Sequence, residues 1–162
     1  MKKYSKEETE ALNSYGGFSE KFTEILNREG AEVSEYLSIY NKIKELLVID
    51  VEALEDSVDC SRKRVDFLYC DVSKEIVLVE CKLRVGNAEN CNIRDLTQKY
   101  QESVTTLDEV EHDRKVSKCY FVLFKDSQDE IAKDYLERNF YIYQDICSIE
   151  ARSITTFSES IL

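Results

Sequence analysis

Residues 64–84 read Arg-Val-Asp-Phe-Leu-Tyr-Cys-Asp-Val-Ser-Lys-Glu-Ile-Val-Leu-Val-Glu-Cys-Lys-Leu-Arg, and this stretch decides the fold. It contains two apolar runs, residues 65–70 and 76–79, separated by the polar residues 71–75. Short apolar runs with turn-forming residues between them are typical of two β-strands that form a hairpin. We therefore expect a buried hairpin here.

Three charged side chains interrupt this apolar hairpin. Asp66 lies inside the first run, and Glu80 and Lys82 follow the second. Because side chains alternate across a strand, Glu80 and Lys82 face the same way, while Cys81 points to the other side. Asp66 joins them if the hairpin register brings it opposite. Two carboxylates beside an ammonium at the end of a hydrophobic hairpin predict a site for a hard metal ion.

An Asp in a hydrophobic strand, followed by Glu-x-Lys at the end of the next strand, resembles the motif of the PD-(D/E)XK nuclease superfamily. The residues that match this motif are Asp66, Glu80, Cys81 and Lys82. The resemblance covers residues 64–84 and departs from the motif at the proline, because the chain has no proline. It implies a restriction-endonuclease-like fold.

The resemblance also implies a nuclease that uses Mg²⁺ or Mn²⁺. In that superfamily, carboxylates placed like Asp66 and Glu80 bind the metal, and the main-chain carbonyl at the position of Cys81 adds an oxygen ligand. Metal coordination lowers the pKa of bound water. A lysine placed like Lys82 orients or deprotonates the attacking water. We therefore expect hydrolysis of phosphodiester bonds, in DNA rather than RNA.

Further site residues follow from the resemblance. A carboxylate from the helix before the sheet assists in many members, and Glu35 is the first candidate, with Glu20 as the alternate. The helix after the motif supplies a polar group near the phosphate, for which Gln98 and Lys99 are candidates. Tyr100 is two residues from Gln98 and cannot share its helix face, so we interpret it as a core residue.

Basic residues around the hairpin are candidates for phosphate contacts. They are Arg62, Lys63, Arg64, Arg84 and Lys99. A solvated basic turn explains the first three equally well, and an exposed helix glutamate explains Glu35 or Glu20. Both interpretations stay open at this point.

The chain of 162 residues has a net charge of −11, which opposes binding to a phosphate backbone. The acidic excess lies outside the candidate site, because residues 61–100 contain eight Lys/Arg and six Asp/Glu. We expect weak, salt-sensitive binding to bare duplex, helped by a protein partner that offsets the acidic surface. A homodimer is expected by analogy, since cutting both strands usually takes two sites.

Composition restricts the remaining classes. The six cysteines form no C-x-x-C pair, so we expect reduced, mainly buried thiols and no zinc or iron–sulfur site. The lone histidine, His112, is expected in an exposed loop. No apolar run is long enough to span a membrane and none follows the basic start, which predicts a cytoplasmic protein without membrane contact.

Hydrophobic periodicity predicts the order of elements along the chain. We expect helices at residues 4–13, 19–30, 31–46, 93–110 and 128–139, and strands at residues 47–54, 65–70, 76–79, 118–124 and 140–149. The αβββαβ order of residues 31–124 is that of the restriction-endonuclease-like core. It predicts an α/β domain with a mixed β-sheet flanked by helices. A single domain of residues 1–162 then has N-terminal helices at about 1–30 and a C-terminal helix and strand at about 125–162.

Two other functions fit the same residues. A non-catalytic domain of this fold that binds nucleic acid or a protein is favoured by the acidic surface and opposed by the complete Asp-Glu-Lys set. An RNA endonuclease of this fold matches the motif as well as a DNA enzyme does.

Overall fold

The computed structural model describes residues 2–12, 18–51, 62–110, 113–139 and 143–162. Its α-helices are α1 (Lys6–Leu12), α2 (Phe22–Arg28), α3 (Leu37–Ile43), α4 (Ile93–Val110), α5 (Asp129–Asn139) and α6 (Ile154–Ile161). Its strands are β1 (Phe18–Lys21), β2 (Leu47–Asp50), β3 (Phe67–Cys70), β4 (Ile76–Cys81), β5 (Val116–Phe124) and β6 (Ser148–Ser153). Short 3₁₀ turns lie at Val33–Tyr36, Ala88–Asn90 and Asp126–Gln128.

The six described strands form one mixed sheet in the order β1-β2-β3-β4-β5-β6. Strands β1 to β4 pair antiparallel, whereas β4 with β5 and β5 with β6 pair parallel. Parallel neighbours need a crossover, and α4 and α5 supply the two crossovers. The sheet thus changes from antiparallel to parallel at β4.

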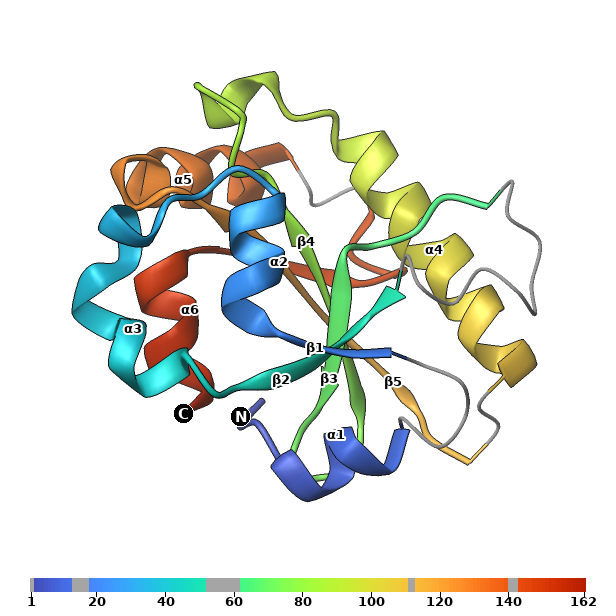
Figure 1. The fold of residues 1–162 in the computed structure, drawn as a ribbon. Helices are drawn as coiled ribbons and strands as arrows, with labels where there is room; N and C mark the ends of the chain where they lie inside the picture. The colour runs from blue at the N-terminus through green and yellow to red at the C-terminus, as the bar shows by residue number, and fades with distance from the viewer. Residues whose placement is uncertain (1, 13–17, 52–61, 111–112, 140–142) are drawn as a thin grey trace.

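Helices cover both faces of the sheet (Figure 1). On one face, α2, α3 and α6 pack on a cluster that includes Phe22, Ile39 and Phe157. On the other face, α4 and α5 contribute Leu96 and Leu136 to a second cluster. The expected α/β class, with a mixed sheet between helices, is confirmed. The observed order α3-β2-β3-β4-α4-β5 also matches the order expected for residues 31–124.

Residues Phe18–Lys21 do not begin the helix expected at residues 19–30, so this prediction is wrong at its start. These four residues form β1, which pairs antiparallel with all of β2, and the helix begins only at Phe22. The pairing supplies backbone hydrogen bonds that a local helical pattern cannot reveal, because the partner strand is more than twenty residues away.

Two apolar side chains of the helices point away from the core. Leu37 is 65% exposed, because the segment starts as the 3₁₀ turn Val33–Tyr36, whose tighter winding changes which residues of α3 face the sheet. Ile39 is buried in its place. In α5, Ile131 is exposed, since Ala132 and Leu136 occupy the buried side one turn apart.

The C-terminal end differs from the expected strand at residues 140–149. Strand β6 runs later, at Ser148–Ser153, where it pairs parallel with β5 from Cys119 to Phe124. Residues 140–142 lie outside the described residues. Helix α6 was not expected; it begins after Ser153, whose hydroxyl accepts a hydrogen bond from the Thr156 N–H at 3.1 Å. This is an N-cap of the usual kind.

The five described cysteines are free thiols, and four of them are buried, as expected. They are Cys70, Cys81, Cys91, Cys119 and Cys147. Cys60 and His112 lie outside the described residues. No helix in the described ranges has the length and apolar character needed to cross a membrane.

Helix α6 is held on the sheet by an aromatic cluster centred on Phe157. Its ring lies 5.1 Å from that of Phe121 and 5.8 Å from that of Phe22, measured between ring centroids. Phe67 and Tyr69 of β3 complete the cluster at 6.4 and 6.2 Å. Phe157 therefore joins three strands or helices distant in sequence.

We predict that Phe157→Ala lowers the free energy of unfolding by about 3–5 kcal/mol, because it leaves a cavity among rigid rings. Leu37→Ala, at an exposed position, serves as the control and should change it by less than about 0.5 kcal/mol. Urea unfolding followed by circular dichroism measures both values. Equal effects of the two substitutions would contradict the assignment of α6 to the core.

Candidate functional site

The hairpin of β3 and β4 brings the two motif carboxylates together. Phe67 pairs with Val79 and Cys70 pairs with Ile76. Continuing this antiparallel register by one pair sets Asp66 opposite Glu80. Asp66 is two residues before Leu68, and Glu80 is two residues after Leu78; both leucines belong to the cluster under α4, so the two carboxylates lie on that face of the sheet, and both are buried.

Glu80 lies between two lysines. Its Oε1 is 2.5 Å from the Lys99 Nζ of α4 and 3.3 Å from the Lys82 Nζ. Its side chain is only 2% exposed, whereas each lysine is about one-fifth exposed. The other carboxylate oxygen, Oε2, is buried and has no hydrogen-bond partner among the described residues.

Asp66 is held by the backbone of the opposite strand. Its Oδ2 accepts a hydrogen bond from the Cys81 N–H at 2.7 Å. Burial, and then the charge of Glu80, raise the pKa of Asp66 to about 8, although the Cys81 N–H favours the ionised form. The charge of Glu80 therefore disfavours the ionised form of Asp66.

The electrostatics of the lysines complement this pair. Burial also raises the pKa of Glu80, and Lys99 and Lys82 offset that effect only in part. Burial opposes the charge on Lys99, but Glu80 and then Asp66 outweigh it, so the pKa of Lys99 is raised above its ordinary value. Lys99 thus remains an ammonium group beside Glu80 at neutral pH.

Glu29 is a carboxylate near this pair that the sequence pattern did not single out. It is the C-cap residue of α2, and its charge contributes to the raised pKa of Asp66. The loop after β4 is attached to the same helix end, because the Arg84 guanidinium donates to the Arg28 carbonyl at 2.7 Å. Gly30, at φ +113°, allows this approach, since a Cβ there would lie 2.6 Å from Arg84 Cγ.

A second group that the sequence analysis missed is the Tyr120 hydroxyl of β5. It is fully buried, and no hydrogen-bond partner for it lies in the described part of the chain. Burial and then the charge of Glu80 raise the pKa of Tyr120. Tyr120 reads as an ordinary core residue in an apolar strand, so nothing in the sequence pattern distinguishes it.

The structure gives the two helix carboxylate candidates other partners. Glu35 lies in the 3₁₀ turn, accepts from the Glu32 N–H and is 2.9 Å from the Lys125 Nζ, and these contacts lower the pKa of Glu35. Glu20 lies in β1 beside Glu24, and a hydrogen bond with Glu24 is the main cause of its raised pKa. Neither contact involves Asp66 or Glu80.

The predicted residues of the following helix divide into three environments. Lys99 reaches Glu80, as described above. Gln98, the adjacent candidate, is exposed to solvent. Tyr100 is buried and its hydroxyl donates to the Ser117 carbonyl at 2.9 Å, which confirms its interpretation as a core residue.

Two of the three basic residues before the hairpin form ion pairs with α4. Arg62 pairs with Glu109 at 2.8 Å, and Lys63 pairs with Asp95. Arg64 is half-buried. Arg84 lies on the other side of the site, against α2. Phosphate contact by any of these four residues stays a prediction.

The donor set suits a small hard cation. Mg²⁺ typically binds one or two protein carboxylates and completes its shell with water and substrate oxygens. Asp66 and Glu80 supply two carboxylates, and the partnerless Oε2 of Glu80 is a ready acceptor. No group of three His, Cys, Asp or Glu side chains is gathered as a metal site among the described residues.

Comparison of the chain with protein-family models, with curated proteins and with solved structures finds no match.

The raised pKa of Asp66 predicts a pH-dependent stability. Between its ordinary value of 3.8 and about 8, folded Asp66 holds a proton that the unfolded chain has lost, so stability falls as pH rises through this window. In EDTA, the parent should therefore lose at least about 1 kcal/mol more than Asp66→Asn between about pH 5 and about pH 8. Urea unfolding at both pH values measures this difference.

The control for this experiment is Asp145→Asn, which changes an exposed carboxylate. It should follow the parent at both pH values. If the free energy of unfolding depends on pH in the same way in the parent and in Asp66→Asn, the raised pKa of Asp66 is contradicted.

Proposed function

We propose that this chain is a nuclease of the PD-(D/E)XK type that hydrolyses phosphodiester bonds with the help of Mg²⁺ or Mn²⁺. The observation that carries the proposal is the buried Asp66–Glu80 pair with two lysines on Glu80. A buried pair of carboxylates is costly unless it serves as a binding site for a cation. DNA is proposed as the substrate ahead of RNA, and the motif itself fits both.

Asp66 and Glu80 would hold the metal ion, together with the main-chain carbonyl of Cys81. When bound, the ion would supply Lewis acidity and lower the pKa of a coordinated water. The Cys81 N–H supports this arrangement by orienting the Asp66 carboxylate from the opposite strand. Glu29, at the end of α2, is a further candidate carboxylate because its charge acts on Asp66, whereas the contacts of Glu35 and Glu20 lie elsewhere.

The two lysines would have different roles in the reaction. Lys82 would orient the attacking water by donating to it, because its amine lies 3.3 Å from Glu80, beside the carboxylates that would hold the metal ion. Lys99, held as an ammonium by Glu80, would contact the phosphate and balance the charge that develops during attack. Gln98 is exposed one residue away and would add at most a polar contact to substrate.

The net negative charge of this protein opposes its approach to a nucleic acid, which is also negatively charged. Lys82, Lys99 and Arg84 place positive charge near the carboxylates, whereas the chain as a whole carries −11. Long-range repulsion should make duplex binding weak and strongly dependent on salt. A basic partner protein would relieve this repulsion.

The first test is cleavage of labelled single- and double-stranded DNA and RNA in Mn²⁺, Mg²⁺ or EDTA. We expect metal-dependent cutting of DNA by the parent and by Asp145→Asn. Asp66→Asn and Glu80→Gln should lose both the cutting and the rise in melting temperature that Mn²⁺ produces, because a ligand of the folded state stabilises it.

The outcomes separate the alternatives. Cutting of RNA alone would make the chain an RNA endonuclease of the same site. Nucleic-acid binding without cutting, and without any effect of Mn²⁺ on the melting temperature, would overturn the proposal of an enzyme. The chain would then be a binding domain.

A second prediction distinguishes the two lysines. Lys82→Ala should slow cutting by about 10²–10⁴-fold and leave the stabilisation by Mn²⁺ intact. This is the result expected for a side chain that acts on the attacking water and binds no metal. Lys99→Met should also lower the free energy of unfolding of the metal-free protein by about 1–3 kcal/mol, since it leaves Glu80 with a single countercharge. Thermal melting with and without Mn²⁺ measures both effects.

A further inference from the structure

Strand β6 is the outermost strand at its end of the sheet. It pairs with β5 on one side, and among the described strands none pairs with its other side. An outer strand presents backbone donors and acceptors to which another strand can add. The Ala151 carbonyl accepts a hydrogen bond from the Arg152 Nη1 of the same strand at 2.9 Å. A side chain is thus a hydrogen-bond partner of this carbonyl.

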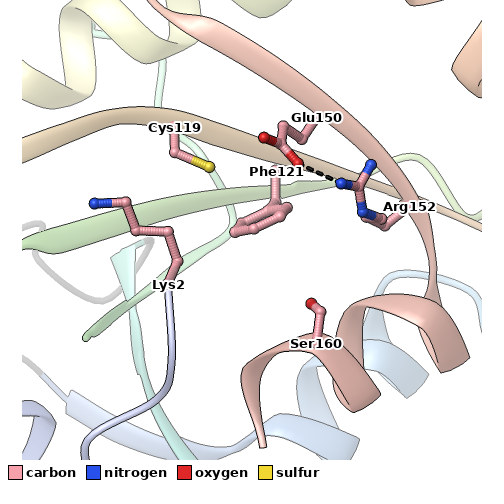
Figure 2. Close-up of a pocket in the computed structure, with 6 residues that line it drawn as sticks. All are labelled: Lys2, Cys119, Phe121, Glu150, Arg152 and Ser160. Atoms are coloured by element: carbon pink, nitrogen blue, oxygen red, sulfur yellow. Dashed lines mark hydrogen bonds and ion pairs between the residues drawn. The ribbon is translucent and has the colours of Figure 1, made fainter. Parts of the chain in front are cut away.

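The space beside β6 is open on both faces of the sheet. One hollow is lined by Phe121 and Ser160, from β5 and α6 (Figure 2). A second is lined by Lys133 and Leu136 of α5. Both hollows extend to Glu150 and Arg152, so helices flank the edge of β6 and leave room for an approaching chain.

The side chains along this edge carry opposite charges two residues apart. Figure 2 shows Glu150 and Arg152 reaching toward each other beside Phe121, and they form an ion pair within β6. Residues two apart in a strand lie on the same face. Each is partly exposed, at 38% and 28% of its side chain.

This spacing makes the strand complementary to itself. When two copies of β6 pair antiparallel about a two-fold axis at Ala151, Glu150 of each copy lies directly opposite Arg152 of the other. The four side chains then alternate in sign on one face of the joined sheet. Opposite charges directly across a strand pair stabilise it, and like charges destabilise it.

We propose that β6 is a homodimerisation edge, at which a second copy of this chain adds its own β6 and extends the sheet across a two-fold axis. Self-complementary contacts of this kind are what a two-fold interface requires. The inference is independent of the proposed nuclease activity, because it depends on the edge strand alone.

The interface must overcome the acidic surface of the two copies. At moderate salt the repulsion between the distant charges is screened beyond about 8–10 Å, whereas the paired charges at β6 are in contact. A pair of six-residue strands is smaller than the interface of a permanent dimer. We therefore expect a dissociation constant of about 1–100 µM.

Sedimentation equilibrium of the full chain, from about 1 µM to about 200 µM, tests the proposal. The parent should change from monomer to dimer over this range. Glu150→Arg and Arg152→Glu should each weaken dimerisation at least about tenfold, because each places like charges opposite one another. An equimolar mixture of the two variants should form a heterodimer, since a strand with two arginines then faces a strand with two glutamates.

Glu159→Arg is the matched control, because it makes the same charge change at an exposed residue of α6. It should dimerise like the parent, and circular dichroism melting should show that all variants are folded. A monomeric parent at every concentration would overturn the proposal. So would a dimer that tolerates both β6 variants, or a mixture that fails to associate.

Discussion

The constraint on which this structure depends is the burial of the β3–β4 hairpin on both faces. Every residue of both strands is buried, so the two faces each require a layer of helices. Helices α2, α3 and α6 supply one layer, and α4 and α5 the other. The same burial explains why the pKa values of the two carboxyl groups at the end of the hairpin are raised. Asp66 and Glu80 are removed from water with the strands that carry them.

The position of the site follows from the change in sheet direction at β4. After β4 the chain must cross over to a parallel neighbour, and it does so through α4. This crossover lays Lys99 over the end of β4, where its ammonium meets Glu80. On the opposite face, Arg84 attaches the same loop to the end of α2, near Glu29. Charged groups from three segments are thus gathered at the end of the central β3–β4 hairpin by connections that the fold already needs.

The middle of the sheet and its β6 edge carry different charged groups. Strands β3 and β4, in the middle, bring together the buried charges of the candidate site, whereas β6 ends the sheet with an exposed pair of opposite charges. Glu150 and Arg152 neutralise each other within one strand, which suits an edge that must avoid indiscriminate pairing. The same pair permits selective pairing with an identical strand. A nuclease acting on two strands would gain from such a pairing, although the edge and the site depend on different residues.

The sequence alone determined the types and order of the elements from α3 to β5 and the proximity of Asp66, Glu80 and Lys82. These depend on local alternation and on charges within apolar runs, which are visible over a few residues. Tertiary structure decided what depends on distant partners: β1 became a strand because β2 pairs with it, and β6 with α6 were placed by β5 and the aromatic cluster. It also decided which groups meet Asp66 and Glu80. Lys99 was predicted as one of several candidates, and Glu29 was missed, because the distance between side chains on separate helices is set by packing and not by spacing along the chain.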